Sequence, residues 1–194
     1  EPPPGNTVIY YDKNSSTQVV SQVFKYDGII ETNLTNDLTY NYWWVRVSAD
    51  KTKFLCYRSP KVNNNYLDNK SNDYANADLM VFNIDGTNPK VIIQKGKYGW
   101  SEQGVAKFSP DGTKILMAAL CTDPARGSND LHWRLVITDI NGNNPKIIST
   151  RNSLFADPAW SPDGKKIVYV TLPPGMLIGY QDQFELYAAD YNAT

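Results

Sequence analysis

The chain has 194 residues with a formal net charge of −1, and 41% of its residues are hydrophobic and 20% charged, values ordinary for a globular protein. Lysine and arginine are scattered along the chain, so the sequence offers no basic surface for nucleic acid. No apolar run approaches the roughly 18 to 20 residues of a membrane span, and we expect neither nucleic-acid binding nor a membrane span.

The first predicted element is a pair of short strands, a half unit over residues 6–24. The segment "NTVIYYDKNSSTQVVSQ" (6–22) matches the second half of the repeating units that follow it. Asparagine is abundant, and with glycine and proline it fills the gaps between apolar runs, as expected where tight turns separate short strands. The composition therefore favours an all-β fold.

A turn motif then occurs three times. The copies are "WVRVSADKTKFLCYRS" (44–59), "AKFSPDGTKILMAAL" (106–120) and "AWSPDGKKIVYVTL" (159–172). In Ser-Pro-Asp-Gly, proline fixes φ, aspartate bonds its own backbone and glycine adopts the left-handed conformation, so each copy predicts a hairpin. Lys51 replaces the glycine in the first copy, and we expect that turn to be strained or differently shaped.

A second motif follows each copy of the first. It reads "LMVFNIDGTNPKVII" (79–93), "LVITDINGNNPKIIS" (135–149) and, shortened, "ELYAADYNAT" (185–194). Each unit therefore predicts four antiparallel strands, A to D, and units of about 50 residues indicate a β-propeller. The predicted blades cover residues 43–94, 105–149 and, in part, 157–190. The alternative, a β-sandwich, does not explain turn sequences repeated in register.

The repeats resemble those of the TolB-like propellers, a six-bladed family with WD40-like (PD40) repeats. The matching residues are Ser109, Pro110, Asp111, Gly112, Ser161, Pro162, Asp163 and Gly164, with Phe108 and Trp160 before the two turns. The resemblance implies the fold and a periplasmic or other exported location in the bacterial envelope. It leaves function open, because related propellers occur in envelope lipoproteins, beside prolyl-peptidase catalytic domains and in pectin-fragment lyases.

The predicted ring is incomplete, with about three to three and a half blades against the usual four to eight. One explanation is that the chain is part of a longer protein. The other is a homodimer, in which the leading strand of one copy completes the last blade of another.

The predicted binding face carries the B-to-C loops (60–77, 121–132 and 173–183) and the D-to-A loops. The D-to-A loops supply aromatic residues that suit stacking against a glycan or peptide, although they could equally fill seams between blades. These residues are Tyr40, Tyr42, Trp43, Tyr98, Trp100 and Phe155. Arg46 and Lys107 are expected at the start of strand A, with Asp157 nearby, where they could hold a charged ligand or simply line a solvated channel.

Other reactive residue types give weaker signals. His132 beside Asp130 is a candidate ligand contact, but a lone histidine cannot form a multi-histidine metal centre. Asp68, Asp73 and Asp78 offer oxygen atoms for calcium, without the spacing of an EF-hand loop. Cys56 and Cys121 are expected to be free thiols. No nucleophile elbow or phosphate-binding loop is present, so no catalytic residue, metal or cofactor is predicted.

The sequence therefore predicts a noncatalytic binding or scaffold propeller of the bacterial cell envelope that recognises a protein or glycan on its long-loop face. The alternative is the propeller of a carbohydrate-active enzyme, similar to oligogalacturonate lyase, or the accessory propeller of a prolyl-peptidase-like enzyme. A third possibility is a purely architectural spacer.

Overall fold

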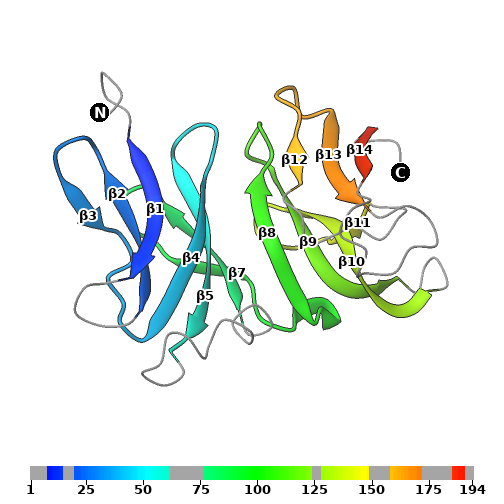
Figure 1. Cartoon of the computed structure of the whole chain (residues 1–194), viewed down its shortest axis with the longest axis horizontal. Coiled ribbons are helices and arrows are strands. Elements are labelled where there is room, and N and C mark those ends of the chain that lie inside the picture. Colours follow the sequence, from blue (N-terminus) through cyan, green and yellow to red (C-terminus); the bar gives the residue numbers. More distant parts are fainter. Residues whose placement is uncertain are drawn as a thin grey trace. The chain divides into compact units, whose positions relative to one another are not determined.

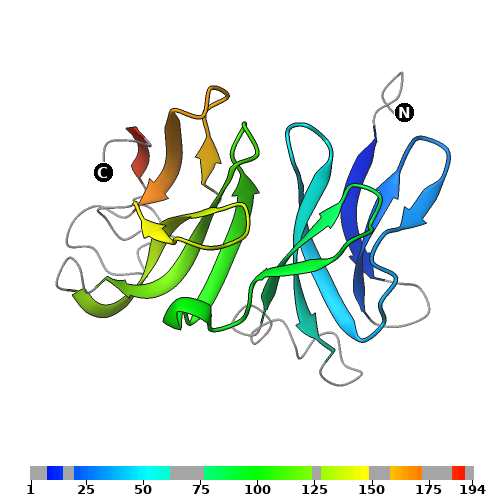
Figure 2. The same cartoon turned by 180° about the vertical axis from the view of Figure 1, so that it is seen from behind.

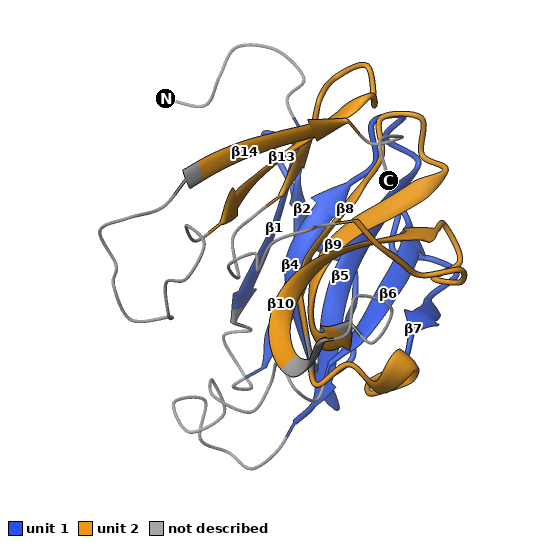
Figure 3. Cartoon of the chain, turned by 90° about the vertical axis from the view of Figure 1, so that its right-hand side faces the viewer, with its two compact units in different colours: residues 1–94 blue, residues 95–194 orange. Residues whose placement is uncertain are grey.

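The computed structural model describes residues 8–14, 20–61, 77–123, 128–148, 158–171 and 185–190. In this part of the chain the strands form four antiparallel sheets, and in each sheet neighbouring strands follow one another along the chain (Figures 1 and 2). The chain divides into two compact units, residues 1–94 and 95–194 (Figure 3). Over the same described ranges, no helix has the length and apolar character needed to cross a membrane.

Unit 1 contains the first and second sheets. The first sheet consists of β1 (Ile9–Asn14), β2 (Ser21–Tyr26) and β3 (Glu31–Asn33). The second sheet consists of β4 (Tyr40–Val47), β5 (Lys53–Pro60), β6 (Asp78–Asn83) and β7 (Lys90–Ile93). Four consecutive residues of β5, from Phe54 to Tyr57, are buried, so both faces of this sheet are covered.

Unit 2 contains the third and fourth sheets. The third sheet consists of β8 (Glu102–Phe108), β9 (Lys114–Asp123), β10 (Ser128–Asp139) and β11 (Lys146–Ile147). The fourth sheet consists of β12 (Ala159–Trp160), β13 (Lys166–Thr171) and β14 (Glu185–Asp190). A short 3-10 helix, Lys97–Gly99, precedes β8.

Two segments differ from the sequence-based expectation. The leading segment forms a sheet of three strands reaching Asn33, where a pair of strands over 6–24 was expected. Its three strands pair in the order β1-β2-β3. The expected loop 121–132 is largely a hairpin extension of β9 and β10, in which His132 lies opposite Cys121.

The three A-to-B turns share one hydrogen-bonding pattern. The hydroxyls of Ser48, Ser109 and Ser161 donate to the aspartate two residues later, at 2.6, 2.5 and 2.6 Å. Each hydroxyl also accepts the backbone N–H five residues later, at 2.9 to 3.0 Å. The first turn keeps this hydrogen-bonding pattern, although Lys51 takes a left-handed φ of 58°. Of the two expectations for this turn, it is therefore strained and not differently shaped.

Each unit has a core between its two sheets. In unit 1 the buried residues are Val23, Leu34, Tyr42, Val45, Phe54, Cys56, Met80 and Phe82. In unit 2 they are Leu116, Ala118, Leu135, Ile137, Ile167 and Tyr169. Because strand side chains alternate between faces, each sheet contributes one set of alternate residues to its core.

Candidate functional site

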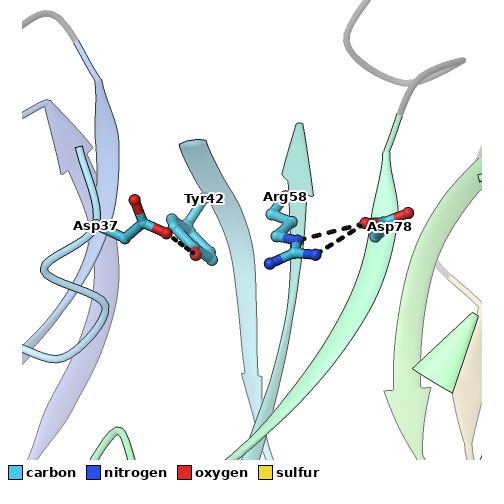
Figure 4. A network of polar contacts seen from close by, with 4 residues as sticks. All are labelled: Asp37, Tyr42, Arg58 and Asp78. Carbon is cyan, nitrogen blue, oxygen red and sulfur yellow. Dashed lines mark hydrogen bonds and ion pairs between the residues drawn. The ribbon is translucent and has the colours of Figure 1, made fainter. Parts of the chain in front are cut away.

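The loop end of the second sheet gathers charged and aromatic side chains from three neighbouring strands. Tyr42 on β4 lies opposite Arg58 on β5, which in turn lies opposite Asp78 on β6. Antiparallel pairing places directly opposed side chains on the same face, so these residues form a row across the sheet (Figure 4). With Asp37 and Tyr40 they make up what we call the Arg58 cluster.

Arg58 and Asp78 form an ion pair in this cluster. The Nε and Nη2 atoms of Arg58 donate to one carboxylate oxygen of Asp78, at 3.3 and 3.2 Å. The guanidinium also lies 4.4 Å from the ring centre of Tyr40, a cation–π arrangement. Burial by itself lowers the pKa of Arg58, but the hydrogen bonds with Asp78 and Tyr42 and the charge of Asp78 together outweigh it, and the pKa is raised. Arg58 therefore stays charged, with about a fifth of its side chain open to solvent.

The other half of the cluster joins Tyr42 to Asp37. The Tyr42 hydroxyl donates to Asp37 Oδ2 at 3.2 Å, while the backbone N–H and hydroxyl of Thr39 donate to Asp37 Oδ1. Burial, followed by the charge of Asp37, raises the pKa of Tyr42. Burial also acts to raise the pKa of Asp37, but the hydrogen bonds from Thr39 and Tyr42 outweigh it and the pKa is lowered. The pair is thus a neutral phenol donating to a carboxylate.

This arrangement suits recognition more than bond breaking. It holds one guanidinium, two carboxylates and two phenol rings in fixed positions, with the Arg58 and Asp78 side chains partly exposed. Such groups can order a polar segment of a partner. Within the described ranges, no three His, Cys, Asp or Glu side chains come close enough together to hold a metal ion. Asp78, considered above as a calcium ligand, pairs with Arg58; Asp68 and Asp73 lie outside the described residues.

The sequence-predicted aromatic residues are mostly not at loop tips. Tyr40, Tyr42 and Trp43 belong to β4, and Tyr42 is only 3% exposed because it packs in the core of unit 1. Trp43 stacks on Tyr57, with ring centres 6.4 Å apart. Trp100 is buried. Phe155 lies outside the described residues.

Tyr98 is exposed, but a hydrogen bond holds its side chain in place. Left-handed backbone at Gly96, Tyr98 and Gly99 folds the connection before β8 into a tight turn. The Tyr98 hydroxyl donates to the carbonyl of Gly142 at 2.9 Å, in the turn between β10 and β11. This hydrogen bond joins the segment before β8 to the turn between β10 and β11, although the strand register keeps the starts of β8 and of that turn at opposite ends of the sheet.

The charged candidates are also displaced from their expected places. Arg46 and Lys107 lie near the ends of β4 and β8, toward the A-to-B turns, because both strands begin earlier than the sequence indicated. Arg46 donates to the carbonyl of Val45 at 3.0 Å. Asp157 lies outside the described residues. Asp130 belongs to β10, but its side chain is not described, and His132 is half-buried on the same strand.

Sequence reasoning missed Asp37 and Arg58 and gave Asp78 a different role. The usable signal was the strand register: Arg58 and Asp78 flank the expected 60–77 loop and become neighbours once β5 pairs with β6. The expectation of free thiols at Cys56 and Cys121 is confirmed, and both are buried. Burial raises the pKa of the Cys56 thiol.

Known proteins similar to this chain share its fold. No known family model matches the sequence. The Tol-Pal system protein TolB of Wigglesworthia glossinidia brevipalpis is 46% identical over 48 residues, covering 25% of this chain and 11% of that protein. The TolB of Blochmanniella pennsylvanica is 35% identical over 100 residues, covering 46% of this chain and 22% of that protein. The chain thus spans about a tenth to a fifth of the length of these relatives.

Solved structures extend the likeness to nearly the whole chain. A putative TolB from Agrobacterium tumefaciens has a TM-score of 0.63 at 15% identity, covering 95% of this chain and 57% of that one. TolB from Acinetobacter baumannii has a TM-score of 0.62 at 16% identity, covering 97% and 40%. An oligogalacturonate lyase in complex with manganese has a TM-score of 0.61 at 16% identity, covering 88% and 45%. The predicted all-β, TolB-like propeller with an incomplete set of blades is therefore confirmed.

Proposed function

We propose that this chain is part of a noncatalytic binding propeller of a bacterial cell envelope, and that the Arg58 cluster contacts a protein partner. The supporting observation is the cluster itself, in which Arg58 is held by Asp78 on one side and by the ring of Tyr40 on another. Arginine and tyrosine are the residue types that most often dominate binding energy in protein interfaces. Because its neighbours already fix its position, Arg58 loses little side-chain freedom on binding.

The burial of aromatic residues favours a protein over a glycan. Sugar recognition by stacking needs ring faces open to solvent, and Tyr42 and Trp100, two of the aromatic residues predicted for that role, are buried. The charged pair of Arg58 and Asp78 is instead partly exposed. A partner offering both a carboxylate and a basic group fits this pair.

The relatives supply the proposed setting. Both curated relatives are named as Tol-Pal system proteins, and we extend that setting, including an exported, periplasmic location, to this chain. The partner to test first is therefore the Pal component for which that system is named. Fold likeness to a lyase adds no catalytic residues to this proposal.

The test compares two exchanges on β5. Arg58→Gln removes the charge of the cluster, and Lys53→Gln removes an exposed charge at the other end of the same strand. We expect Arg58→Gln to weaken binding of purified Pal, measured by calorimetry, by about tenfold or more, as for an interface hot spot. Lys53→Gln should bind as the unchanged protein does. Equal affinity of a folded Arg58→Gln variant, or no binding of Pal by the unchanged protein, would refute the proposal.

A further inference from the structure

A glutamine stands in the first sheet where the next two sheets carry an apolar residue. Gln22 on β2 lies five residues before the Asp-Gly of the following turn, as Met80 does before its Asp-Gly and Val136 before its Asn-Gly. All three side chains are buried, and Gln22 is 0% exposed. The repeated fold thus accepts an apolar residue at this position, and a departure from such a pattern is expected where a residue serves function.

The amide of Gln22 spends its hydrogen-bonding capacity mainly on the connection between β3 and β4. Its Oε1 atom accepts the backbone N–H of Asp37 at 3.1 Å and the hydroxyl of Thr35 at 2.8 Å. Its Nε2 atom donates to the carbonyls of Asp37, Tyr40 and Ser21 at 2.9, 3.1 and 3.0 Å. One side-chain amide therefore bonds to three residues of this connection.

Other side chains complete the attachment of the connection to β2. Beyond the end of β3 the backbone groups need partners outside a strand ladder. The backbone N–H groups of Ser21 and Val23, on either side of Gln22, donate to the side chains of Asn41 and Thr35 at 3.0 and 3.1 Å. A buried polar group whose bonds are all made rigidifies its surroundings and specifies one arrangement. The connection is therefore held against β2 by amide and hydroxyl side chains.

The connection that Gln22 holds carries two members of the Arg58 cluster. Asp37 bonds to Gln22 through both its backbone N–H and its carbonyl, and its carboxylate accepts the hydroxyl of Tyr42 (Figure 4). Tyr40 bonds to Gln22 through its carbonyl, and its ring lies 4.4 Å from the guanidinium of Arg58. Gln22 itself is buried, so any effect on a partner passes through these neighbours.

We propose that Gln22 is a positioning residue of the Arg58 cluster. Its buried amide fixes the backbone of Asp37 and Tyr40, so that the carboxylate and the ring already meet Tyr42 and Arg58 before a partner binds. Groups arranged in advance lose less freedom on binding, which raises affinity without adding a contact. The expected effect on binding rests on the proposed function, whereas the effect on the placement of Asp37 does not.

Exchange of Gln22 for methionine tests the placement of Asp37. Gln22→Met introduces the residue type that the next repeat has at this position, of similar length but without the amide. Burial acts to raise the pKa of Asp37, but hydrogen bonds from Thr39 and Tyr42 outweigh it and the pKa is lowered. We expect Gln22→Met to return the Asp37 pKa toward its ordinary value of 3.8, measured by NMR titration, and to leave the pKa of Asp50 unchanged. A general loss of stability would not single out Asp37.

A matched control is Gln103→Met, which removes the amide of another buried glutamine, on β8 in unit 2. It should leave the Asp37 pKa unchanged. A measurement on the unchanged chain needs no variant to fold: the two Nε2 protons of Gln22 should exchange slowly with solvent, because both are bonded. Fast exchange of these protons, or an unchanged Asp37 pKa in folded Gln22→Met, would overturn the proposal.

Binding of purified Pal separates this inference from the proposed function. If the unchanged chain binds Pal, Gln22→Met should weaken the affinity by about two- to tenfold, as expected when one or two groups must be ordered on binding, and Gln103→Met should not weaken it. Equal affinity of Gln22→Met and the unchanged chain would overturn the role of Gln22 in binding. If Pal does not bind at all, the proposed function fails, and the titration of Asp37 decides by itself whether Gln22 positions the cluster.

Discussion

The hydroxyl of Tyr42 donates a 3.2 Å hydrogen bond to Asp37 while its ring is buried in the core of unit 1. Tyr42 therefore serves both packing and the polar cluster. We expect Tyr42→Phe to lower the free energy of unfolding by about 1 kcal/mol, the usual net value of one hydrogen bond. Tyr42→Ala should lower it by about 3 to 5 kcal/mol, because it also leaves a large cavity. Urea denaturation measures both, and equal stabilities of the two variants would contradict this account.

The backbone of Lys51 predicts a stabilising exchange. Its φ of 58° lies close to the 69° of Gly112 and Gly164 at the equivalent turn positions. Lys51→Gly removes the strain of placing a side chain on left-handed backbone. The greater freedom of glycine in the unfolded state offsets part of this effect, so we expect the free energy of unfolding to rise by up to about 1 kcal/mol. Gly112→Ala should lower the free energy of unfolding by about 1 kcal/mol through φ alone, because an added Cβ would meet no other atom within 4 Å. Thermal unfolding of both variants should show opposite shifts; a destabilised Lys51→Gly would be inconsistent with strain.

The turn aspartates predict how stability depends on pH. The hydrogen bond from Ser48, followed by those from Thr52, lowers the pKa of Asp50 from 3.8 to about 2. Because the pKa of Asp50 is lower in the folded state, its hydrogen bonds contribute fully to the free energy of unfolding above pH 3.8, and this stabilisation is lost as the pH falls toward 2. Ser48→Ala should raise the Asp50 pKa toward its ordinary value, which NMR titration of the carboxyl group measures. An unchanged pKa in that variant would contradict the assigned cause.

The two cysteines should be unreactive in the folded chain. Both are buried, and burial raises the pKa of Cys56, which disfavours the reactive thiolate. We expect both thiols to react with a thiol reagent only after denaturant is added. Rapid modification of either cysteine in the folded protein would show that its surroundings open more readily than the packing indicates.

The local turn chemistry allowed much of the fold to be predicted. The conformation of the turn at Ser109, Asp111 and Gly112 is set by hydrogen bonds between residues only two positions apart. The hairpins and their repetition could therefore be predicted from the sequence. Burial depends on register instead. Tyr42 looks like a loop residue in the sequence but becomes a core residue because β4 begins at Tyr40. Arg58 and Asp78 are 20 residues apart in the sequence and come into contact because β5 pairs with β6. No pattern of neighbouring residues predicts this contact.

The central claim, that the Arg58 cluster contacts a protein partner, is tested most directly by hydrogen–deuterium exchange of this chain with and without Pal. The account predicts slower exchange of backbone amides in peptides covering residues 37–42, 58–61 and 77–80 when Pal is bound. It predicts unchanged exchange in the A-to-B turns around Asp50, Asp111 and Asp163. Protection confined to those turns, with none around Arg58, would contradict it.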